Sequence, residues 1–151
     1  MVKIVTKNKK AYFDYEILED WEAGLVLHGP EIKAIRAGRV NMTGSYVKPF
    51  AHEGVQELWW VGGDFHLEGN IDDARSRKIL MHKTEVERIL GRLSAGNCTV
   101  VPLELYLQRG LAKLKIGLAT KRKLHNKRDL LKKRATDREI ERSLKEKQRT
   151  D

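Results

Sequence analysis

The clearest pattern of hydrophobic and polar positions lies late in the chain and predicts a β-hairpin. Valine or leucine occupies every second position of residues 101–107, and leucine or isoleucine does so in residues 114–118. A period of two places alternate side chains on opposite faces of a strand. Arg109-Gly110 supplies the turn. Lys113, which precedes Leu114, is therefore expected to point outward.

Further strands are predicted earlier in the chain. Residues 11–27 are rich in aromatic and β-branched side chains without helical spacing, which favours two strands that turn near Glu19-Asp20. Residues 45–50 and 55–61 predict a second hairpin, in which the adjacent Trp59 and Trp60 point to opposite faces. Residues 62–77 are polar and contain glycine and aspartate, so a long surface loop is expected; residues 77–81 are too short to assign.

Two helices are predicted between these strands. Pro30 favours a helix start, and residues 31–37 would direct Ile32 and Ile35 to the core and Glu31 to solvent. A second helix is predicted from Thr84 as the cap, with Glu87 reaching back to it. Its apolar positions follow the spacing of one helix face: Val86, Ile89, Leu90 and Leu93, with Gly96 ending the helix.

These elements predict a mainly β protein with short helices. Six or so short, hairpin-linked strands favour an antiparallel sheet that closes or nearly closes as a small barrel over residues 1–119. Residues 120–151 have good helix formers but few apolar side chains, too few to fold alone. We therefore expect a barrel followed by a tail.

Charge separates these two parts further. The 151 residues carry a net charge of +9, but residues 120–151 hold 13 Lys and Arg against 6 Asp and Glu, a net +7. The first 119 residues are therefore nearly neutral. A basic segment of this kind favours binding to a polyanion, either nucleic acid or an acidic membrane surface.

Motifs for catalysis or metal binding are not found in the sequence. It contains no phosphate-binding glycine loop, no dinucleotide fingerprint and no nucleophile elbow, and its five histidines lack metal-ligand spacing. Cys98 is the only cysteine, so no internal disulfide can form, and we expect it in the core. We predict no enzyme activity and no cofactor or metal.

No segment of the sequence predicts export or membrane insertion. An apolar run long enough for a membrane helix is absent, and residues 1–10 do not read as a secretory signal. We therefore predict a cytoplasmic protein.

Separated motifs, in order along nearly the whole chain, resemble the SmpB family, the SsrA-binding proteins of bacterial trans-translation. Glu22-Ala23-Gly24 precedes the block GPEIKAIRAG at 29–38, and RSRKILMHK follows at 75–83. The other matching segments are 8–11, 14–15, 41, 45–47, 101–103, 106, 110, 113, 116–119, 123, 125 and 127–128. One such block could arise by chance, but several in register make the match specific.

The resemblance implies an OB-like β-barrel with flanking helices and no catalytic activity. It implies binding to the tRNA-like domain of transfer-messenger RNA and delivery, with elongation factor Tu, to ribosomes stalled on messages without a stop codon. It implies a tail that is disordered when free and helical in the decoding centre of 16S rRNA and the empty mRNA channel.

The resemblance also implies site residues. Glu22, Leu80 and Lys113 match the family's RNA-binding positions: Lys113 would contact phosphate, and Glu22 would accept a hydrogen bond from a base or ribose hydroxyl or hold a basic residue. The decoding-centre segment is matched by Lys123, His125, Lys127 and Arg128. Lys121 and Asn126 depart from the family's usual glycine and aspartate.

From the residues alone, three other interpretations stay open. A generic basic RNA-binding or ribosome-associated protein on an OB-like barrel would lack the selective tRNA-like partner. An enzyme acting on RNA would turn over RNA or nucleotide. A membrane-surface protein would use its basic tail to bind anionic lipid.

Overall fold

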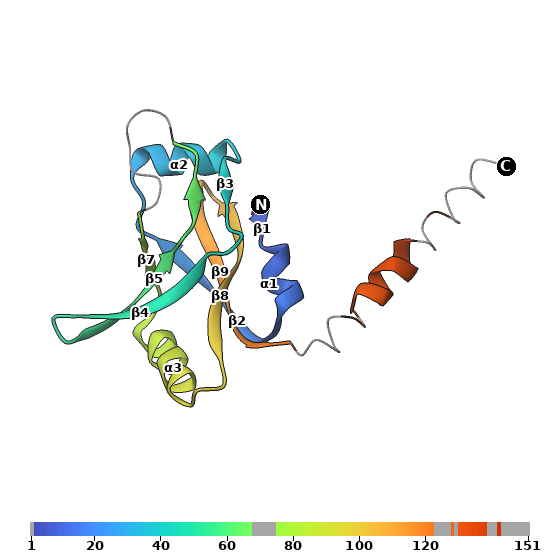
Figure 1. Cartoon of the computed structure of the whole chain (residues 1–151). Helices are drawn as coiled ribbons and strands as arrows, with labels where there is room; N and C mark the ends of the chain where they lie inside the picture. Colours follow the sequence, from blue (N-terminus) through green and yellow to red (C-terminus); the bar gives the residue numbers. More distant parts are fainter. Residues whose placement is uncertain (1, 68–74, 123–127, 129, 139–141, 143–151) are drawn as a thin grey trace. The chain divides into compact units, whose positions relative to one another are not determined.

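A computed structural model gives the structure of the chain (Figure 1). It describes all residues except 1, 68–74, 123–127, 129, 139–141 and 143–151. The chain divides into two compact units, Met1–Lys121 and Arg122–Asp151. The first unit ends two residues beyond the predicted limit of the barrel.

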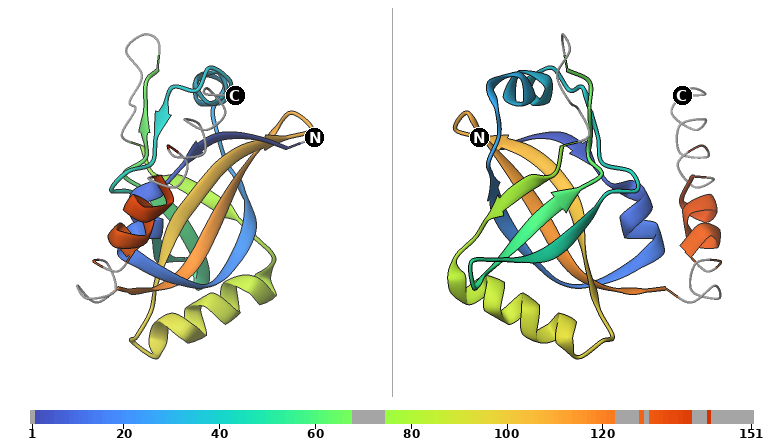
Figure 2. Two further views of the ribbon diagram at one scale, coloured as in Figure 1. Left: turned by 90° about the vertical axis from the view of Figure 1, so that its right-hand side faces the viewer. Right: turned by 60° about the vertical axis from the view of Figure 1, so that its left-hand side comes forward.

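The first unit is built on a seven-stranded antiparallel sheet, which confirms the predicted mainly β class. Its strand order is β1-β8-β9-β2-β7-β5-β4. The strands are β1 (Val2–Lys7), β2 (Tyr15–Leu25), β4 (Tyr46–His52), β5 (Val55–Val61), β7 (Arg77–Leu80), β8 (Thr99–Gln108) and β9 (Leu111–Lys121). The sheet curls around one core (Figure 2), although no ladder among the described residues joins β4 to β1.

The segment predicted as two strands is instead a helix followed by one long strand. Helix α1 (Lys9–Asp14) begins at Asn8, whose Oδ1 accepts from the backbone N–H of Ala11 at 3.3 Å. Strand β2 then runs without a turn through Glu19-Asp20. The local irregularity that does occur there is a register shift between Ile17 and Glu19 against β9.

The late hairpin forms as predicted, but its alternation is broken once. A register shift between Pro102 and Glu104 means that Leu105 packs in the main core, while Leu103 packs in a second, smaller cluster. That cluster lies on the outer face, between the sheet and Ala11 of α1. Gly117 makes room for it, because a Cβ there would lie 2.7 Å from Leu103 Cδ1.

Two longer helices lie at opposite ends of the curled sheet (Figures 1 and 2): α2 (Gly29–Arg36) and α3 (Lys83–Ser94). Pro30 occupies the first turn of α2, as predicted. Helix α3 begins one residue before the predicted cap. Its N-cap is His82, whose N–H donates to Glu85, so the pair Thr84 and Glu87 is not the capping box.

The segment predicted as a surface loop contains core residues. Strand β6 (Asp64–Phe65) pairs with β3 (Val40–Asn41) in a separate two-stranded sheet, and Phe65 is fully buried. Arg77, at the end of the predicted loop, opens β7 and is also fully buried. Trp60 is buried and Trp59 only half-buried, as their opposite faces predicted, and Cys98 is half-buried beside the core.

In the second unit, the described residues are helical at Arg128, 130–138 and Arg142. Thr136 Oγ1 donates to the carbonyl of Lys132 one turn earlier, at 3.0 Å. Exposed basic side chains, among them Arg128 and Lys133, dominate this helix. No helix in the described part of the chain is long and apolar enough to cross a membrane.

Candidate nucleic-acid interface

A row of five residues crosses the outer face of the sheet and brings two of the predicted site residues together. Lys113 on β9 lies directly opposite Gly24 on β2, and Gly24 lies opposite Leu80 on β7. On the other side, Tyr106 on β8 lies opposite Lys113, and Ile4 on β1 lies opposite Tyr106. Residues paired in register share a face, so Lys113 and Leu80 flank the side-chain-free position of Gly24.

Glu22, the third predicted residue, lies on the same face, two residues before Gly24 on β2. It is exposed and lies opposite Lys115. Its Oε2 accepts a hydrogen bond of 2.6 Å from the Tyr106 hydroxyl. The structure therefore gathers Glu22, Leu80 and Lys113 on one outer face of β2, β7 and β9.

The surroundings of this face are unusually apolar for exposed positions. Leu80 is 49% exposed and Ile4 is 57% exposed, and Val26 and Leu111 nearby are also exposed. Val26 extends the face by one more pairing, because its N–H donates to the carbonyl of Lys78 at 3.0 Å. Apolar side chains beside lysines suit a ligand with both flat and charged surfaces, as ribose and bases beside phosphates provide.

The β7 edge of this face is anchored by a buried ion network. Glu31 on α2 was predicted to be exposed, but it is 1% exposed and accepts from Arg75 and from the buried Arg77. Its Oε1 also accepts from the His28 N–H at 2.8 Å. Burial alone would raise the pKa of Glu31, but the His28 and arginine hydrogen bonds outweigh it and lower that pKa.

Arg77 is held on its other sides as well. Its guanidinium carbon lies 3.8 Å from the centroid of the Phe65 ring, and Nη1 donates to the Gly63 carbonyl at 3.2 Å. Arg77 is three residues from Leu80 on the same strand. The network therefore fixes the strand that presents Leu80.

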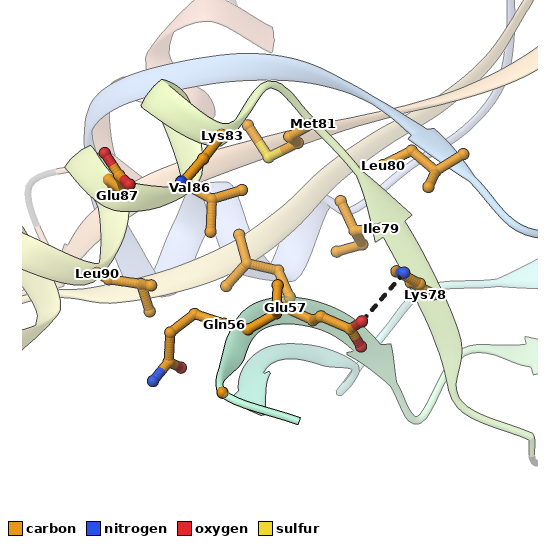
Figure 3. A pocket seen from close by; sticks show the side chains of 13 residues that line it. Gln56, Glu57, Lys78, Ile79, Leu80, Met81, Lys83, Val86, Glu87 and Leu90 are labelled. Atoms are coloured by element: carbon orange, nitrogen blue, oxygen red, sulfur yellow. Dashed lines mark ion pairs between the residues drawn. The ribbon is translucent and has the colours of Figure 1, made fainter. Parts of the chain in front are cut away.

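Beside this face, a groove of about 520 Å³ lies between β5, β7 and α3 (Figure 3). Its walls include Val55, Met81, Val86 and Leu90, and an ion pair of 3.1 Å joins Lys78 to Glu57 at its edge. Figure 3 shows Leu80 and the core residue Ile79 projecting to different sides of β7. Leu80 is thus a surface residue, although leucine is among the residue types most often buried.

The predicted tail residues are placed only in part. Lys123, His125 and Lys127 lie outside the described residues, and Arg128 is exposed on helical backbone. Within the described ranges, no group of three or more metal-ligating side chains is found.

Comparison with known proteins identifies the class to which this fold and face belong. The SmpB protein family model matches residues 5–146. The SsrA-binding protein of a Nitratiruptor species is 46% identical over 151 residues, covering 96% of this chain and 99% of the relative. That of Bacillus cytotoxicus is 42% identical over 154 residues, covering 97% and 96%.

A solved structure described as "tmRNA-SmpB: a journey to the center of the bacterial ribosome" contains a similar chain. That chain is 40% identical, with a TM-score of 0.61, covering 79% of this chain and 85% of that one. The protein is thus a member of an RNA-binding class with a small antiparallel β fold. It belongs to the SmpB family.

The residues alone gave no reason to single out Tyr106, Ile4 or Val26. Tyr106 entered only as a position matching the family, although its pairing with Lys113 places it within the face. Its signal was the polar hydroxyl on an alternating strand, because a buried tyrosine usually finds a hydrogen-bond partner. The partner itself, 84 positions away, could not be read from the sequence.

Proposed function

We propose that this protein binds the tRNA-like domain of transfer-messenger RNA and delivers that RNA to stalled ribosomes for trans-translation, in which incomplete peptides are tagged. The observation that carries the proposal is the match to the family over residues 5–146, with SsrA-binding relatives aligned over nearly their whole length. The solved tmRNA-SmpB structure is named for the same RNA and for the bacterial ribosome.

In this proposal, the outer face around Gly24 contacts the tRNA-like domain. The Lys113 ammonium contacts phosphate, Leu80 packs against a ribose or base, and Glu22 accepts a hydrogen bond. Their gathering on one face supports a common ligand, since Glu22 and Lys113 are 91 positions apart in the sequence. The absence of a side chain at Gly24 makes room for Leu80, because a Cβ there would lie 3.4 Å from Leu80 Cβ and 3.8 Å from Leu80 Cδ1.

The basic tail meets ribosomal RNA in the second part of the proposal. Lys123, Lys127 and Arg128 neutralise phosphates near the decoding centre, and the flat ring of His125 stacks on an exposed base. The rest of the tail occupies the empty mRNA channel as a helix. The net charge of +7 on residues 120–151 and the exposed Arg128 support this division of labour.

The protein acts without catalysis of its own, in the cytoplasm, and elongation factor Tu joins it in the delivery complex. A lack of RNA or nucleotide turnover by the purified protein would agree with this role. Stronger binding to anionic vesicles than to ribosomes would instead favour a membrane-surface role for the tail.

A filter-binding comparison tests the proposal. The full chain is titrated against the tRNA-like domain and against an unrelated structured RNA of equal length at matched salt, because phosphate contacts depend strongly on salt. We expect clear preference for the tRNA-like domain. Equal affinities would refute the proposal and favour a generic RNA-binding protein on the same fold.

A further inference from the structure

A tyrosine side chain spans a whole strand on the proposed RNA face. Tyr106 is on β8 and Glu22 is on β2, and β9 lies between these strands in the sheet. Tyr106 is opposite Lys113 and Glu22 is opposite Lys115, so their 2.6 Å hydrogen bond crosses β9 diagonally between the two lysines. The hydrogen bond therefore restrains a surface carboxylate from a strand that is not its neighbour in the sheet.

The partner of the Glu22 carboxylate is the Tyr106 hydroxyl and not the ammonium group of Lys113 or Lys115. Lys115 lies 3.7 Å from Asp20 on the same face and makes its ion pair there. The tyrosine is a neutral donor, so it orients the Glu22 carboxylate without cancelling its charge. Tyr106 is only 8% exposed, whereas Glu22 is exposed.

The second oxygen of Glu22 is available to a ligand. Oε2 is occupied by the Tyr106 hydroxyl, and Oε1 takes no hydrogen bond from the residues that the structure describes. Burial raises the pKa of Tyr106, and the Glu22 hydrogen bond raises it further, so the hydroxyl stays a donor at neutral pH. A carboxylate repels phosphate and accepts only from O–H or N–H groups.

We propose that Tyr106 is a positioning residue that holds Glu22 so that its free oxygen accepts a hydrogen bond from an RNA donor. The donor is either a ribose 2′-hydroxyl or an amino group of a base edge, the neutral O–H and N–H donors that RNA presents. The inference rests on the proposed function, since it needs RNA on this face. It adds a reason for a carboxylate within a basic RNA site: Glu22 selects a sugar or base edge where Lys113 selects phosphate.

A double-mutant cycle on the full chain tests the coupling between the two residues. Filter binding to the tRNA-like domain is measured for Tyr106→Phe, Glu22→Ala and the double variant at one salt concentration. We expect Tyr106→Phe to weaken binding by about threefold to tenfold, Glu22→Ala at least as much, and the double variant no more than Glu22→Ala. A merely structural tyrosine would give effects that multiply, and no effect of either single variant would equally overturn the inference.

A matched control exists between helix α1 and the same sheet. The Tyr12 hydroxyl donates to Glu104 Oε1 at 3.2 Å, so Tyr12→Phe removes another tyrosine–glutamate bond without touching Glu22. It should leave the RNA affinity within about twofold of the native protein. An equal loss in both tyrosine variants would show a general effect on the fold and refute a special role for Tyr106.

Nucleotide-analogue interference identifies the donor. Pools of the tRNA-like RNA carry random 2′-deoxy substitutions, or inosine in place of guanosine to remove the 2-amino group. The donor lies at a position where substitution interferes with binding to the native protein but not with binding to Glu22→Ala. Interference at that position should be weaker with Tyr106→Phe than with the native protein. The first pool reports a ribose hydroxyl and the second an amino group.

The outcomes separate this inference from the proposed function. A third pool carries purine in place of adenosine, which removes the adenine amino group. If no position in any of the three pools responds to Glu22→Ala, the inference fails. Selective binding by the native protein would still uphold the proposed function. If the native protein shows no preference for the tRNA-like domain, the proposed function fails, and the cycle on whichever RNA binds still decides whether Tyr106 acts through Glu22.

Discussion

Removal of the Glu31 carboxylate is the sharpest test of how the RNA face is held in place. Glu31 is 1% exposed, and its oxygens accept from the His28 N–H, Arg75 and Arg77. In Glu31→Ala the buried guanidinium of Arg77 loses the Glu31 carboxylate, although the Gly63 carbonyl remains 3.2 Å from Nη1. Breaking a buried pair in this way costs about 3 to 5 kcal/mol.

That cost is large enough for a simple thermal melt. For a domain of this size, each kcal/mol lowers Tm by about 2 to 4 °C, so Tm should fall by roughly 6 to 20 °C. Circular dichroism at pH 7 measures it. The matched control is Arg88→Ala, which breaks the exposed pair of Arg88 and Glu19 at 3.1 Å and should cost less than about 1 kcal/mol.

The pH dependence of stability tests the contribution of the ionised Glu31 carboxylate independently. Glu31 has a pKa below its ordinary value of 4.5 in the folded protein, so the folded state prefers the ionised form. Its contribution to stability is therefore complete above the unfolded pKa and is lost as pH falls through the folded pKa. The Tm difference between the native protein and Glu31→Gln should shrink as pH is lowered from 7 toward 3.

Two results would refute this reasoning. One is a fall in Tm for Glu31→Ala no larger than that for Arg88→Ala, which would mean that water or a rearranged side chain replaces the carboxylate. The other is a Tm difference for Glu31→Gln that does not change with pH, which would mean that ionisation of Glu31 contributes nothing.

Three further predictions address the RNA contact, the tail and the packing of the outer face. Lys113→Ala should weaken binding to the tRNA-like domain by roughly 1 to 2 kcal/mol with Tm unchanged, whereas Arg92→Ala on α3 should change neither; an equal loss of Tm would make Lys113 structural. Deletion of residues 122–151 should preserve binding to the tRNA-like domain but abolish tagging on stalled ribosomes, and surviving tagging would contradict the assigned role of the tail. Gly117→Ala should cost about 1 to 3 kcal/mol by denaturant unfolding, because its Cβ would lie 2.7 Å from Leu103 Cδ1; Gly91→Ala, with no atom within 4 Å, should not destabilise.

The end of β9 decides where the tail deletion must begin. The sequence placed the end of the barrel at residue 119, after the last alternating leucine. The ladder continues, however, because Thr120 pairs with Glu16 and Lys121 with Tyr15. A deletion from residue 120 would remove part of β9 and mix a folding defect with a tail defect.

Local patterns predicted the elements whose cause is local. The hairpin of β8 and β9 follows from alternation and a tight turn, and the start of α2 follows from Pro30. The burial of Glu31 has no local cause, since its partner Arg77 lies 46 positions later. Helix α1 was missed for a similar reason: Ala11 is buried against Leu103, and Asn8 Nδ2 donates to the Pro102 carbonyl 94 positions away.

For the site, the family resemblance supplied Glu22, Leu80 and Lys113, but not why they would act together. Their proximity depends on the register of β7, β2 and β9, and a shift of one residue would send each side chain to the other face. Register between strands separated by long connections is set by tertiary packing. It could not be derived from the alternation of any one strand.

The register shifts in β2 and in β8 divide the outer face into a covered half and an open half. On β2, Tyr15 and Ile17 pack outward beneath α1, whereas beyond the shift Trp21 and Ala23 pack inward. The equivalent change on β8 sends Leu103 outward and leaves Tyr106 on the open half. Without the shift in β2, Glu22 and Gly24 would point into the core, and a buried carboxylate there would be strongly destabilising. The bulges in β2 and β8, which interrupt the simple alternation of each strand, are therefore the features that create the proposed RNA face.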